Sequence, residues 1–483
     1  MRPHLPLLAL ALCALVLAGC ASRPVNAPIA EVTPGKGYRF GTRQLQDRDT
    51  ENLVIVAFSG GGTRAAAFSF GVLEALRDTE VTGPKGKSVR LLDEIDVITG
   101  VSGGSFTALA YGLYGDQLFA NYEQQFLKRD VQGMLLAGVL SPSNWGALWS
   151  ESWGRSEMAS QIYDDILFKG ATFRDLDKGN GPLVIASATD ISTGSRLAFT
   201  QSDFDLICSD IDSVPLSRAA AASSAVPLVL SPVTFNNYGG NCGLRPPAWV
   251  RALTEDGAPK RPAGRALQRL REMQSFQDSA NRPYIHLVDG GLSDNLGVRG
   301  ILETLEELES ARTNGRRTRL DGVKRIVVFV VNSLSIPRTD WDQHERPPND
   351  IMILLKATGV PIDRYSYESV EILKDITLRW KLLRELRASG YVVGATGSLR
   401  DAIDTPDIDI YVVDVSFQGL QDRKEFDYLN DLPTSFVLPP EAVDRLRKAA
   451  RTLLAESPEF ARLLRDIGAK KVPAAAPAAA TAQ

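Results

Sequence analysis

The chain is poor in the residues that bind metal ions. Its 483 residues include only four cysteines and three histidines, and these do not form the paired spacing of a zinc site. A P-loop lysine motif and an internal repeat are also missing. The 54 lysines and arginines are balanced by 58 aspartates and glutamates, so no basic field would attract nucleic acid. The sequence therefore predicts no metal, no organic cofactor and no nucleic-acid partner.

An apolar run marks the N-terminus. The stretch MRPHLPLLALALCALVLAGC has Arg2 near its start and an apolar core from Leu5 to Leu17, which is too short for a membrane-spanning helix and typical of a secretory signal. Its end, LAGC, resembles a bacterial lipoprotein box. The resemblance implies a signal peptide over 1–19, cleavage before Cys20 and lipidation of the Cys20 thiol. A plain signal peptide, cut at small residues, is the alternative.

The residues after the signal bear on location. Ala21 follows Cys20, where lipoproteins retained in the inner membrane have an aspartate, so the resemblance implies an outer-membrane lipoprotein facing the periplasm. Residues 20–50 are polar and are expected to form a lipidated tether. In an oxidising compartment Cys208 and Cys242 could pair in a disulfide. Two separate buried thiols are the alternative, because the sequence does not give their distance.

The body of the chain alternates strand-like and helical patterns. Several strand-like segments are apolar on both faces, which suits buried parallel strands. The pattern predicts a three-layer α/β/α domain with a mostly parallel central sheet and helical insertions. We expect a catalytic domain over 51–335, a C-terminal extension over 336–468 that is helical with one strand completing the domain, and a disordered Ala/Pro tail over 469–483. The expected strands are 53–58, 95–99, 183–189, 284–289, 325–331 and 408–415, and the expected helices include 63–77, 103–113 and 300–310.

Two insertions stand out. Residues 119–168 are expected to be helical and contain Trp145, Trp149 and Trp153, whose spacing predicts one helical face. Core packing is the favoured interpretation; an apolar wall for an acyl chain and a membrane-facing stripe are the alternatives. Residues 243–282 carry eight lysines and arginines against four acidic residues. We expect a solvated helix and loop there, with a lid that meets anionic head groups as the alternative.

A glycine-rich loop follows the first expected strand. In FSGGGTRAAAF, residues 58–68, the positions of Gly60, Gly62 and Ala65 satisfy the dinucleotide-binding pattern G-x-G-x-x-G/A. That interpretation requires an acidic residue at the end of the second strand. Asp78 and Glu80 lie at about the right distance, but they fall at the polar end of the first helix, which weakens a nucleotide-binding oxidoreductase.

The second expected strand ends in a different motif. The residues GVSGG, 100–104, fit the nucleophile elbow G-x-S-x-G, in which a sharp strand-to-helix turn exposes the serine, here Ser102. Farther along, VDGGLSDN, 288–295, places Asp289 at the end of another apolar strand. An ordinary Asp-Gly turn is the alternative for Asp289.

Taken together and in this order, the three motifs resemble the patatin-like phospholipase family, and the resemblance runs from about Val54 to Asn295. The segments SATDISTG and SRAAAASSAVPLVLSPV resemble the family's middle segments. Two positions depart from the family pattern, since Ser59 stands where the loop usually has aspartate and Ala65 stands where it usually has glycine. These departures bear on the loop's fine geometry.

The resemblance implies a lipid acyl hydrolase acting on membrane phospholipids or lysophospholipids. Ser102 would be the nucleophile and Asp289 the base. The loop of Gly60, Gly61 and Gly62 would stabilise the oxyanion, with the backbone N–H groups of Gly61 and Gly62 as donors. Arg64 could position the loop, meet a lipid phosphate or be a plain surface residue. Supporting roles are expected for Gly100, Gly104 and Gly290. Another ester hydrolase on the same fold and a non-catalytic membrane-tethered scaffold are alternatives.

The scarcity of histidine favours a Ser–Asp dyad over a triad. His4 leaves with the signal peptide, and His344 lies in a polar, proline-rich stretch. His286 lies on the same expected strand as Asp289, but residues three apart point to opposite faces, and His286 lies about 10 Å back along the strand. A free aspartate is a weak base, and burial would raise its pKa toward the useful range.

Overall fold

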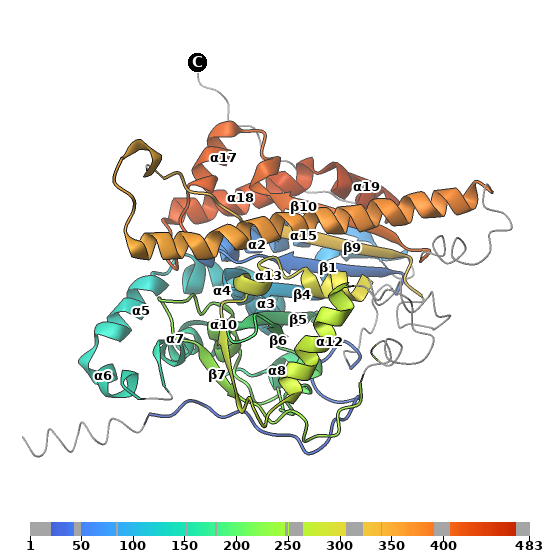
Figure 1. Cartoon of the computed structure of the whole chain (residues 1–483). Coiled ribbons are helices and arrows are strands. Elements are labelled where there is room, and N and C mark those ends of the chain that lie inside the picture. Colours follow the sequence, from blue (N-terminus) through green and yellow to red (C-terminus); the bar gives the residue numbers. More distant parts are fainter. Residues whose placement is uncertain are drawn as a thin grey trace, which may run out of the picture.

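The computed structural model describes most of the chain (Figure 1): residues 21–42, 50–83, 86–150, 153–178, 181–246, 250, 264–305, 322–339, 341–390 and 406–469. The expected signal peptide 1–19, the lipidation candidate Cys20 and all but the first residue of the expected tail lie outside the described residues. Within the described part of the chain, no helix has both the length and the apolar character needed to cross a membrane.

A mixed, mostly parallel sheet forms the centre of the molecule. Its order is β10-β9-β1-β4-β5-β8-β7, with β6 paired to β5. The five strands from β10 to β5 are parallel, whereas β8 is antiparallel to both β5 and β7. The bounds are β1 Asn52–Phe58, β4 Ile95–Val101, β5 Leu183–Asp190, β6 Arg196–Ala198, β7 Val233–Asn236, β8 Tyr284–Val288, β9 Arg325–Asn332 and β10 Asp409–Ser416.

The sequence pattern located the strands correctly. Each of the six expected segments corresponds to an observed strand, with ends that agree to within two residues. The α/β class is confirmed, and the long apolar runs explain the agreement, since the inner residues of β1, β4 and β9 are buried. Strands buried on both faces read as continuous apolar runs. The short strands β6 and β7 escaped prediction because they are too brief to show a period.

Helices cover the sheet and include the C-terminal extension. Helix α2 (Gly62–Arg77) packs against α3 (Gly103–Tyr114) and α18 (Pro440–Glu456). The 39-residue α15 (Asp350–Ala388) runs across the sheet in Figure 1 and contacts β10. The extension thus supplies edge strand β10 and several covering helices. Its other helices are α17 (Arg423–Asn430) and α19 (Pro458–Asp466).

The remaining elements are shorter. Between β4 and β5 lie α4 (Leu118–Tyr122), α5 (Val131–Leu140), α6 (Pro142–Leu148), α7 (Arg155–Tyr163) and α8 (Phe173–Lys178). Helices α9 (Gln201–Phe204), α10 (Leu216–Ser223), α12 (Gly264–Gln277) and α13 (Gly291–Asp294) follow, and a hairpin of β2 (Glu80–Thr82) and β3 (Ser88–Arg90) lies after α2. The helix expected at 300–310 is present over 299–305, and its remainder lies outside the described residues.

The expectation of a free tether over 20–50 is wrong for residues 21–42, which pack along the domain. Tyr38 is fully buried, and its hydroxyl accepts a hydrogen bond from the Val184 backbone N–H at 2.6 Å. Asn26 is also buried and donates to the Ser209 hydroxyl at 2.8 Å. Polar composition alone suggested a tether, but these side chains find specific partners on the fold.

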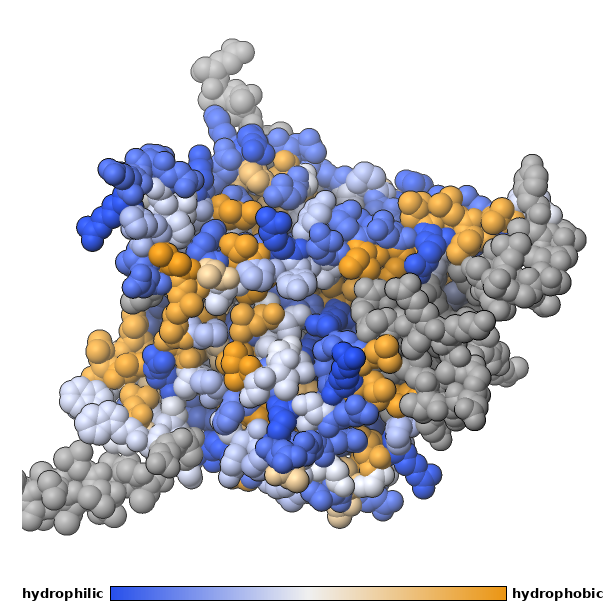
Figure 2. Space-filling view, in the orientation of Figure 1, coloured by the Kyte–Doolittle hydropathy of each residue, from blue (hydrophilic) through white to orange (hydrophobic). Residues whose placement is uncertain are grey.

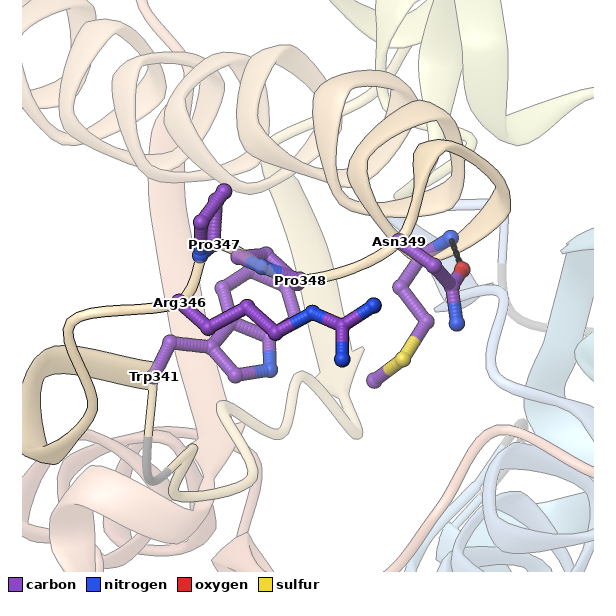
Figure 3. Close-up of a pocket in the computed structure, with 6 residues that line it drawn as sticks. Trp341, Arg346, Pro347, Pro348 and Asn349 are labelled. Carbon is purple, nitrogen blue, oxygen red and sulfur yellow. Dashed lines mark hydrogen bonds between the residues drawn. The ribbon is translucent and has the colours of Figure 1, made fainter.

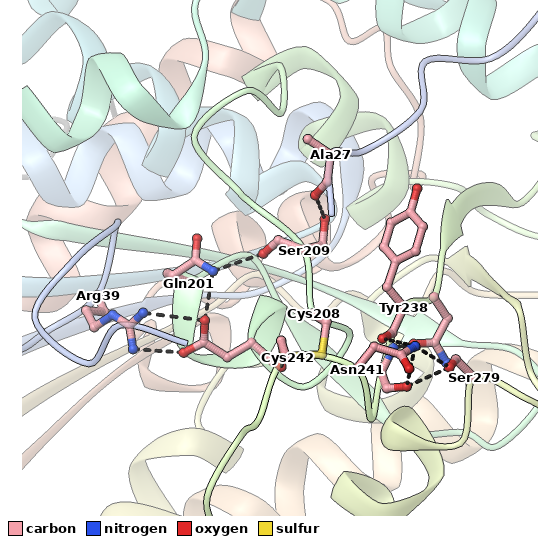
Figure 4. Close-up of a disulfide and its surroundings, with 12 residues drawn as sticks. Ala27, Arg39, Gln201, Cys208, Ser209, Tyr238, Asn241, Cys242 and Ser279 are labelled. Carbon is pink, nitrogen blue, oxygen red and sulfur yellow. Dashed lines mark hydrogen bonds and ion pairs between the residues drawn. A yellow bond between two sulfur atoms is a disulfide. The ribbon is translucent and has the colours of Figure 1, made fainter. Parts of the chain in front are cut away.

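A disulfide joins Cys208 and Cys242, with their Cα atoms 5.6 Å apart (Figure 4). Residues of the N-terminal segment lie directly beside it. The backbone N–H of Ile29 donates to the Cys208 carbonyl at 2.9 Å, and that of Val32 donates to the Cys242 carbonyl at 3.1 Å. The disulfide therefore also supports the surface on which residues 21–42 are held.

The expected tryptophan face does not form. Helix α6 ends at Leu148, so Trp149 is only its C-cap and Trp153 lies beyond the helix. Trp145 and Trp149 are exposed, whereas Trp153 is buried. Core packing is therefore the wrong interpretation for the first two tryptophans, because their side chains are exposed.

The basic insertion over 243–282 packs on the domain where it is described. Helix α12 buries Phe276, and its Arg269 pairs with Asp203 at 2.8 Å. This helix is anchored by apolar and ionic contacts, which differs from the solvated helix that was expected. Residues 247–249 and 251–263 of the insertion lie outside the described residues.

Candidate active site

Ser102 occupies a strained turn between β4 and α3. Its backbone angles are φ 48° and ψ −120°, a conformation that non-glycine residues rarely adopt and that often marks a functional position. Two hydrogen bonds hold the turn. The Ser102 N–H donates to the Ser223 hydroxyl at 2.9 Å, and this hydroxyl donates to the Ser187 carbonyl at 2.7 Å. These two hydrogen bonds fix the backbone of Ser102 at the turn.

Ser102 and Asp289 are in direct contact. The Ser102 hydroxyl donates to Asp289 Oδ2 at 2.8 Å, and both side chains are buried. The second carboxylate oxygen, Oδ1, accepts the Gly291 N–H at 2.8 Å. The backbone of Asp289 is fixed as well, because its N–H donates to the Ala225 carbonyl at 3.0 Å. The carboxylate is thus oriented so that the Gly291 N–H holds one oxygen and the Ser102 hydroxyl donates to the other.

The route by which Asp289 reaches Ser102 differs from the expected one. We expected both residues at carboxyl ends of parallel strands, but β8 is antiparallel to β5. The two strands overlap only at the end of β5, where Thr189 pairs with Val288. The chain then runs back along β5 toward Ser187, which pairs with Val101 beside Ser102. A short antiparallel overlap therefore brings the two side chains together.

Burial sets the charge of Asp289. Removal from water raises the pKa of this carboxyl to about 6, and the hydrogen bonds from the Gly291 N–H and the Ser102 hydroxyl partly offset the rise. A carboxylate with this pKa is a better proton acceptor than a free aspartate and is still ionised at neutral pH. The site can therefore hold a charged base against the serine hydroxyl.

The glycine loop lies against the serine. A Cβ atom added to Gly60 would lie 3.3 Å from Ser102 Cβ, and one added to Gly103 would lie 2.0 Å from the Gly62 carbonyl oxygen. Gly61 and Gly62 have φ angles of 137° and 60°, which glycine alone adopts readily. Only glycines allow the loop and the elbow to approach this closely.

Of the three glycines in the loop, two offer backbone donors that are unoccupied within the described part of the chain. The Gly60 N–H is occupied, because it donates to the Asn295 carbonyl at 2.9 Å. The N–H groups of Gly61 and Gly62 have no acceptor among the described residues, as is usual at a helix start. Gly61 and Gly62 are therefore the residues that can donate to an oxyanion formed at Ser102, while Gly60 anchors the loop.

Arg64 holds the loop in place. Its side chain is buried and donates to the carbonyls of Ser333 and Leu432, each at 2.8 Å, and to the Thr434 hydroxyl at 3.1 Å. Burial lowers the pKa of the guanidinium to about 10. Because the side chain is enclosed by these partners, Arg64 is neither a surface residue nor a contact for a lipid phosphate. It ties α2 to the ends of β9 and α17.

The described histidines lie away from the serine. His286 is exposed on β8, and its Nδ1 hydrogen-bonds the Thr234 hydroxyl at 2.9 Å on the neighbouring strand. His344 is exposed near the start of α15. Neither residue takes part in the hydrogen bonds of the Ser102 and Asp289 side chains.

The structure disfavours a nucleotide at the glycine loop. Asp78, the acid that a dinucleotide site would use, caps the far end of the 16-residue α2 and pairs with Arg451 at 2.8 Å. Glu80 accepts a hydrogen bond from the Ser88 hydroxyl in the β2–β3 hairpin. A helix of this length places Asp78 about 24 Å from the loop, which is too far to bind the ribose of the same nucleotide.

An open pocket lies just before α15 (Figure 3). Asn349 caps this helix by accepting the Met352 N–H at 3.0 Å. None of the residues that hold Ser102 or Asp289 belongs to its lining, so we assign it no part in the site. The lining residues are Trp341, Arg346, Pro347, Pro348, Asn349 and Met352.

A family model for patatin-like phospholipases matches residues 56–302, just over half of the chain. The chain belongs to this family. The match covers the glycine loop, the elbow and Asp289. The comparison with curated proteins gave no significant match.

The solved structures that match this chain are remote in sequence. Human GIVD cytosolic phospholipase A2 shares 11% identity at a TM-score of 0.42, and the match covers 93% of this chain and 66% of the human one. The same human enzyme in complex with methyl gamma-linolenyl fluorophosphonate shares 12% identity at a TM-score of 0.40, and the match covers 86% of this chain and 59% of the human one. VipD from Legionella pneumophila shares 11% identity at a TM-score of 0.27, covering 94% of this chain and 73% of VipD. This chain thus spans less than two thirds of the human chains it matches.

Sequence reasoning missed several residues that shape the site. Asn295 holds Gly60, Ser223 holds the Ser102 backbone, and the Ser435 carbonyl accepts the Thr63 N–H at 2.8 Å. Asn295 was visible as the last letter of the Asp-Gly-Gly motif, and Ser223 lies in a segment resembling the family. Ser435 gave no signal, because it lies more than 370 residues from the loop it contacts.

The raised pKa of Asp289 predicts the pH dependence of the reaction. The basic form is the carboxylate, so kcat/KM should rise with pH through about 6 and level off above neutrality, falling about tenfold per unit on the acid side. The measurement is kcat/KM on a soluble ester between pH 4.5 and 8. A profile that is flat from pH 5 to 7 would exclude this carboxylate as the titrating base.

Proposed function

We propose that this protein is a serine acyl hydrolase that cleaves carboxylic ester bonds of phospholipids or lysophospholipids. The observation that carries the proposal is the 2.8 Å hydrogen bond from the Ser102 hydroxyl to a buried carboxylate with an elevated pKa. Membership of the patatin-like phospholipase family supports lipid esters as the substrate class.

The proposed reaction has two steps. Ser102 Oγ attacks the ester carbonyl carbon while its proton passes to Asp289, and the N–H groups of Gly61 and Gly62 stabilise the tetrahedral oxyanion. Collapse of this intermediate releases the alcohol, which takes the proton from Asp289, and leaves an acyl group on Ser102. Asp289 then accepts a proton from the water that attacks the acyl group, and collapse of this second tetrahedral intermediate frees the fatty acid while Asp289 returns the proton to Ser102 Oγ. A donor of the oxyanion type is typically worth about 3 kcal/mol of transition-state stabilisation.

Product analysis tests this proposal. The purified protein is incubated separately with phosphatidylcholine vesicles, lysophosphatidylcholine micelles and a triacylglycerol emulsion in H₂¹⁸O, and the products are identified by mass. We expect free fatty acid and the matching lysophospholipid or glycerophosphocholine, with ¹⁸O in the fatty acid. Release from triacylglycerol alone would favour another ester hydrolase. A lack of release from every ester would favour the membrane-tethered scaffold.

We also propose that Cys20 carries the membrane anchor, on the outer membrane facing the periplasm. The LAGC sequence and the alanine after the cysteine support this location. The Cys208–Cys242 disulfide is compatible with an oxidising compartment. The substrate would then lie in the same membrane as the enzyme.

Replacing Cys20 tests the anchor. Each buried CH₂ of a lipid chain contributes about 0.8 kcal/mol, so two or more chains hold a protein firmly. We expect Cys20→Ser, expressed behind a conventional cleavable signal in place of residues 1–19, to move most of the protein from the membrane to the soluble fraction after repeated washing and dilution, with quantification by immunoblot. The wild-type protein should stay with the membrane. A variant that resists the same washing would place the anchor elsewhere.

A further inference from the structure

Helices α5 and α6 form a hairpin with an unusual surface. Residues 131–150 contain no charged side chain. Four large apolar residues of this hairpin are exposed, and they come in two pairs spaced four residues apart: Leu136 and Leu140 on α5, and Trp145 and Trp149 at α6. Figure 2 shows hydrophobic residues gathering over this part of the molecule.

Such a surface is unfavourable in water. A surface helix normally has a polar face opposite its buried stripe, but apolar side chains surround α5, and only Val131 and Leu135 are buried. Contiguous exposed apolar patches mark places where a partner or a membrane binds. Tryptophan in particular is enriched at the boundary between lipid and water.

The start of the described chain indicates what covers this surface. The Ser150 hydroxyl, just after α6, donates to the Ala21 carbonyl at 2.6 Å, and Figure 1 shows the described N-terminal end beside α6. Ala21 directly follows Cys20, the residue proposed to carry the lipid. A lipid on Cys20 would therefore enter the bilayer next to the hairpin.

The N-terminal segment also fixes this position. Residues 21–42 are held on the domain, through Asn26 and Tyr38 among others. The anchor point consequently cannot move far from the hairpin, as it could on a free tether. An anchored molecule would hold the hairpin against the membrane surface.

We propose that the α5–α6 hairpin is a membrane-docking face that inserts Leu136, Leu140, Trp145 and Trp149 into the interfacial layer of the bilayer. This inference rests on the lipid surface that the proposed function requires. Because residues 131–150 carry no charge, binding should be driven by apolar burial, should occur on zwitterionic lipid and should be insensitive to salt.

The hairpin is connected to the glycine loop. The Gln132 N–H at the start of α5 donates to the Phe436 carbonyl at 3.2 Å, and the Phe436 N–H donates back to Gln132 Oε1 at 3.3 Å. The neighbouring Ser435 carbonyl accepts the Thr63 N–H at 2.8 Å. Docking through α5 would therefore also hold the oxyanion loop near the lipid.

A second connection runs from the hairpin side to Asp289. Leu228 and Val229 are exposed, and Leu228 has a φ angle of 73° that a leucine rarely adopts. They lie three and four residues after Ala225, whose carbonyl accepts the Asp289 N–H. Two residues farther along the chain, the Ser231 hydroxyl accepts the Ser156 N–H at the start of α7 at 3.1 Å. In the sequence, Leu228 and Val229 thus lie between Ala225, which contacts Asp289, and Ser231, which contacts the helix that follows the hairpin.

Vesicle binding tests the docking face. The mature chain from residue 20 onward, carrying Cys20→Ser to remove the anchor, is mixed with phosphatidylcholine vesicles, and binding is measured by flotation. We expect this parent protein to bind, and Leu136→Ser/Leu140→Ser to weaken binding at least tenfold. The matched control is Leu378→Ser/Leu382→Ser on α15, two exposed leucines at the same spacing, which should bind like the parent.

Further readouts keep the result decisive. Thermal unfolding of both double variants checks that they are folded, and brominated phosphatidylcholine should quench tryptophan fluorescence of the parent but much less that of Trp145→Phe/Trp149→Phe. Adding Ser102→Ala should leave vesicle binding intact, so a failure of docking is distinct from a failure of hydrolysis. The proposal is overturned if the parent does not bind, if the hairpin and control variants bind equally, or if the hairpin variant loses only self-association.

Discussion

Replacing Ser102 by alanine is expected to abolish ester hydrolysis and to leave the protein folded. The change removes the only atom that can form the acyl-enzyme in the proposed mechanism, and losses of this kind reach about four to six orders of magnitude in kcat. Initial rates on a soluble ester and on phosphatidylcholine vesicles provide the measurement. The fold should persist, because the Ser102 backbone remains held by Ser223.

A matched control separates the chemistry from damage to the core. Ser69 is another buried serine, located two turns into α2. The Ser69→Ala change removes a buried hydroxyl group of the same kind at a position outside the proposed site. This control should retain activity within a few-fold of the wild type. Substantial turnover by Ser102→Ala would remove Ser102 from the mechanism.

Replacing Asp289 by asparagine should lower kcat by about three to four orders of magnitude. Asparagine keeps the shape of the side chain but cannot accept the serine proton, and comparable changes in serine hydrolases have effects of this size. The measurement is kcat on one lipid ester. His286→Ala is the control, since His286 bonds Thr234 on the exposed side of β8, and it should retain most activity. The reverse pattern would contradict the dyad and favour a triad.

The Asp289→Asn variant also provides a check on folding. The folded-state pKa of Asp289 is raised above its unfolded value, so the ionised carboxylate costs stability at neutral pH, by about 3 kcal/mol. This cost disappears as the pH falls through about 6 and below the unfolded pKa. Asparagine carries no charge, so the variant should unfold at the same temperature as the wild type or higher at pH 8. Lost activity would then not reflect lost structure.

The sequence predicted the frame of the site well because the frame is local. A buried strand reads as an apolar run, and Ser102 follows such a run within a short glycine-rich turn. The same holds for the loop after β1. In each place the residues that make the structure are neighbours in the chain, so a short motif contains most of the physical information.

The sequence did not predict contacts between distant segments. The carbonyls that hold Arg64 and Thr63 come from Leu432 and Ser435, and their residues carry no motif, because a backbone carbonyl looks the same in every residue. The antiparallel direction of β8 was missed for a related reason. The apolar pattern of a strand reveals burial and says nothing about the direction of its neighbour.

Surface assignments failed where contacts with distant parts of the fold decided the outcome. Trp145 and Trp149 were expected in the core, but both are exposed. The segment expected to be a tether is fixed by the burial of Tyr38. Periodicity and composition are averages over many residues, and they do not record which side chains find partners on the fold.

Covalent trapping of the serine tests the mechanism most directly. A long-chain fluorophosphonate reacts with an activated serine and remains attached, so the protein is treated with it, digested and mapped by mass. We predict one adduct, on the peptide that contains Ser102, together with complete loss of hydrolysis, and at least a hundredfold slower labelling of Asp289→Asn. Labelling at another residue, or full hydrolytic activity in protein whose Ser102 is fully labelled, would contradict the proposed nucleophile.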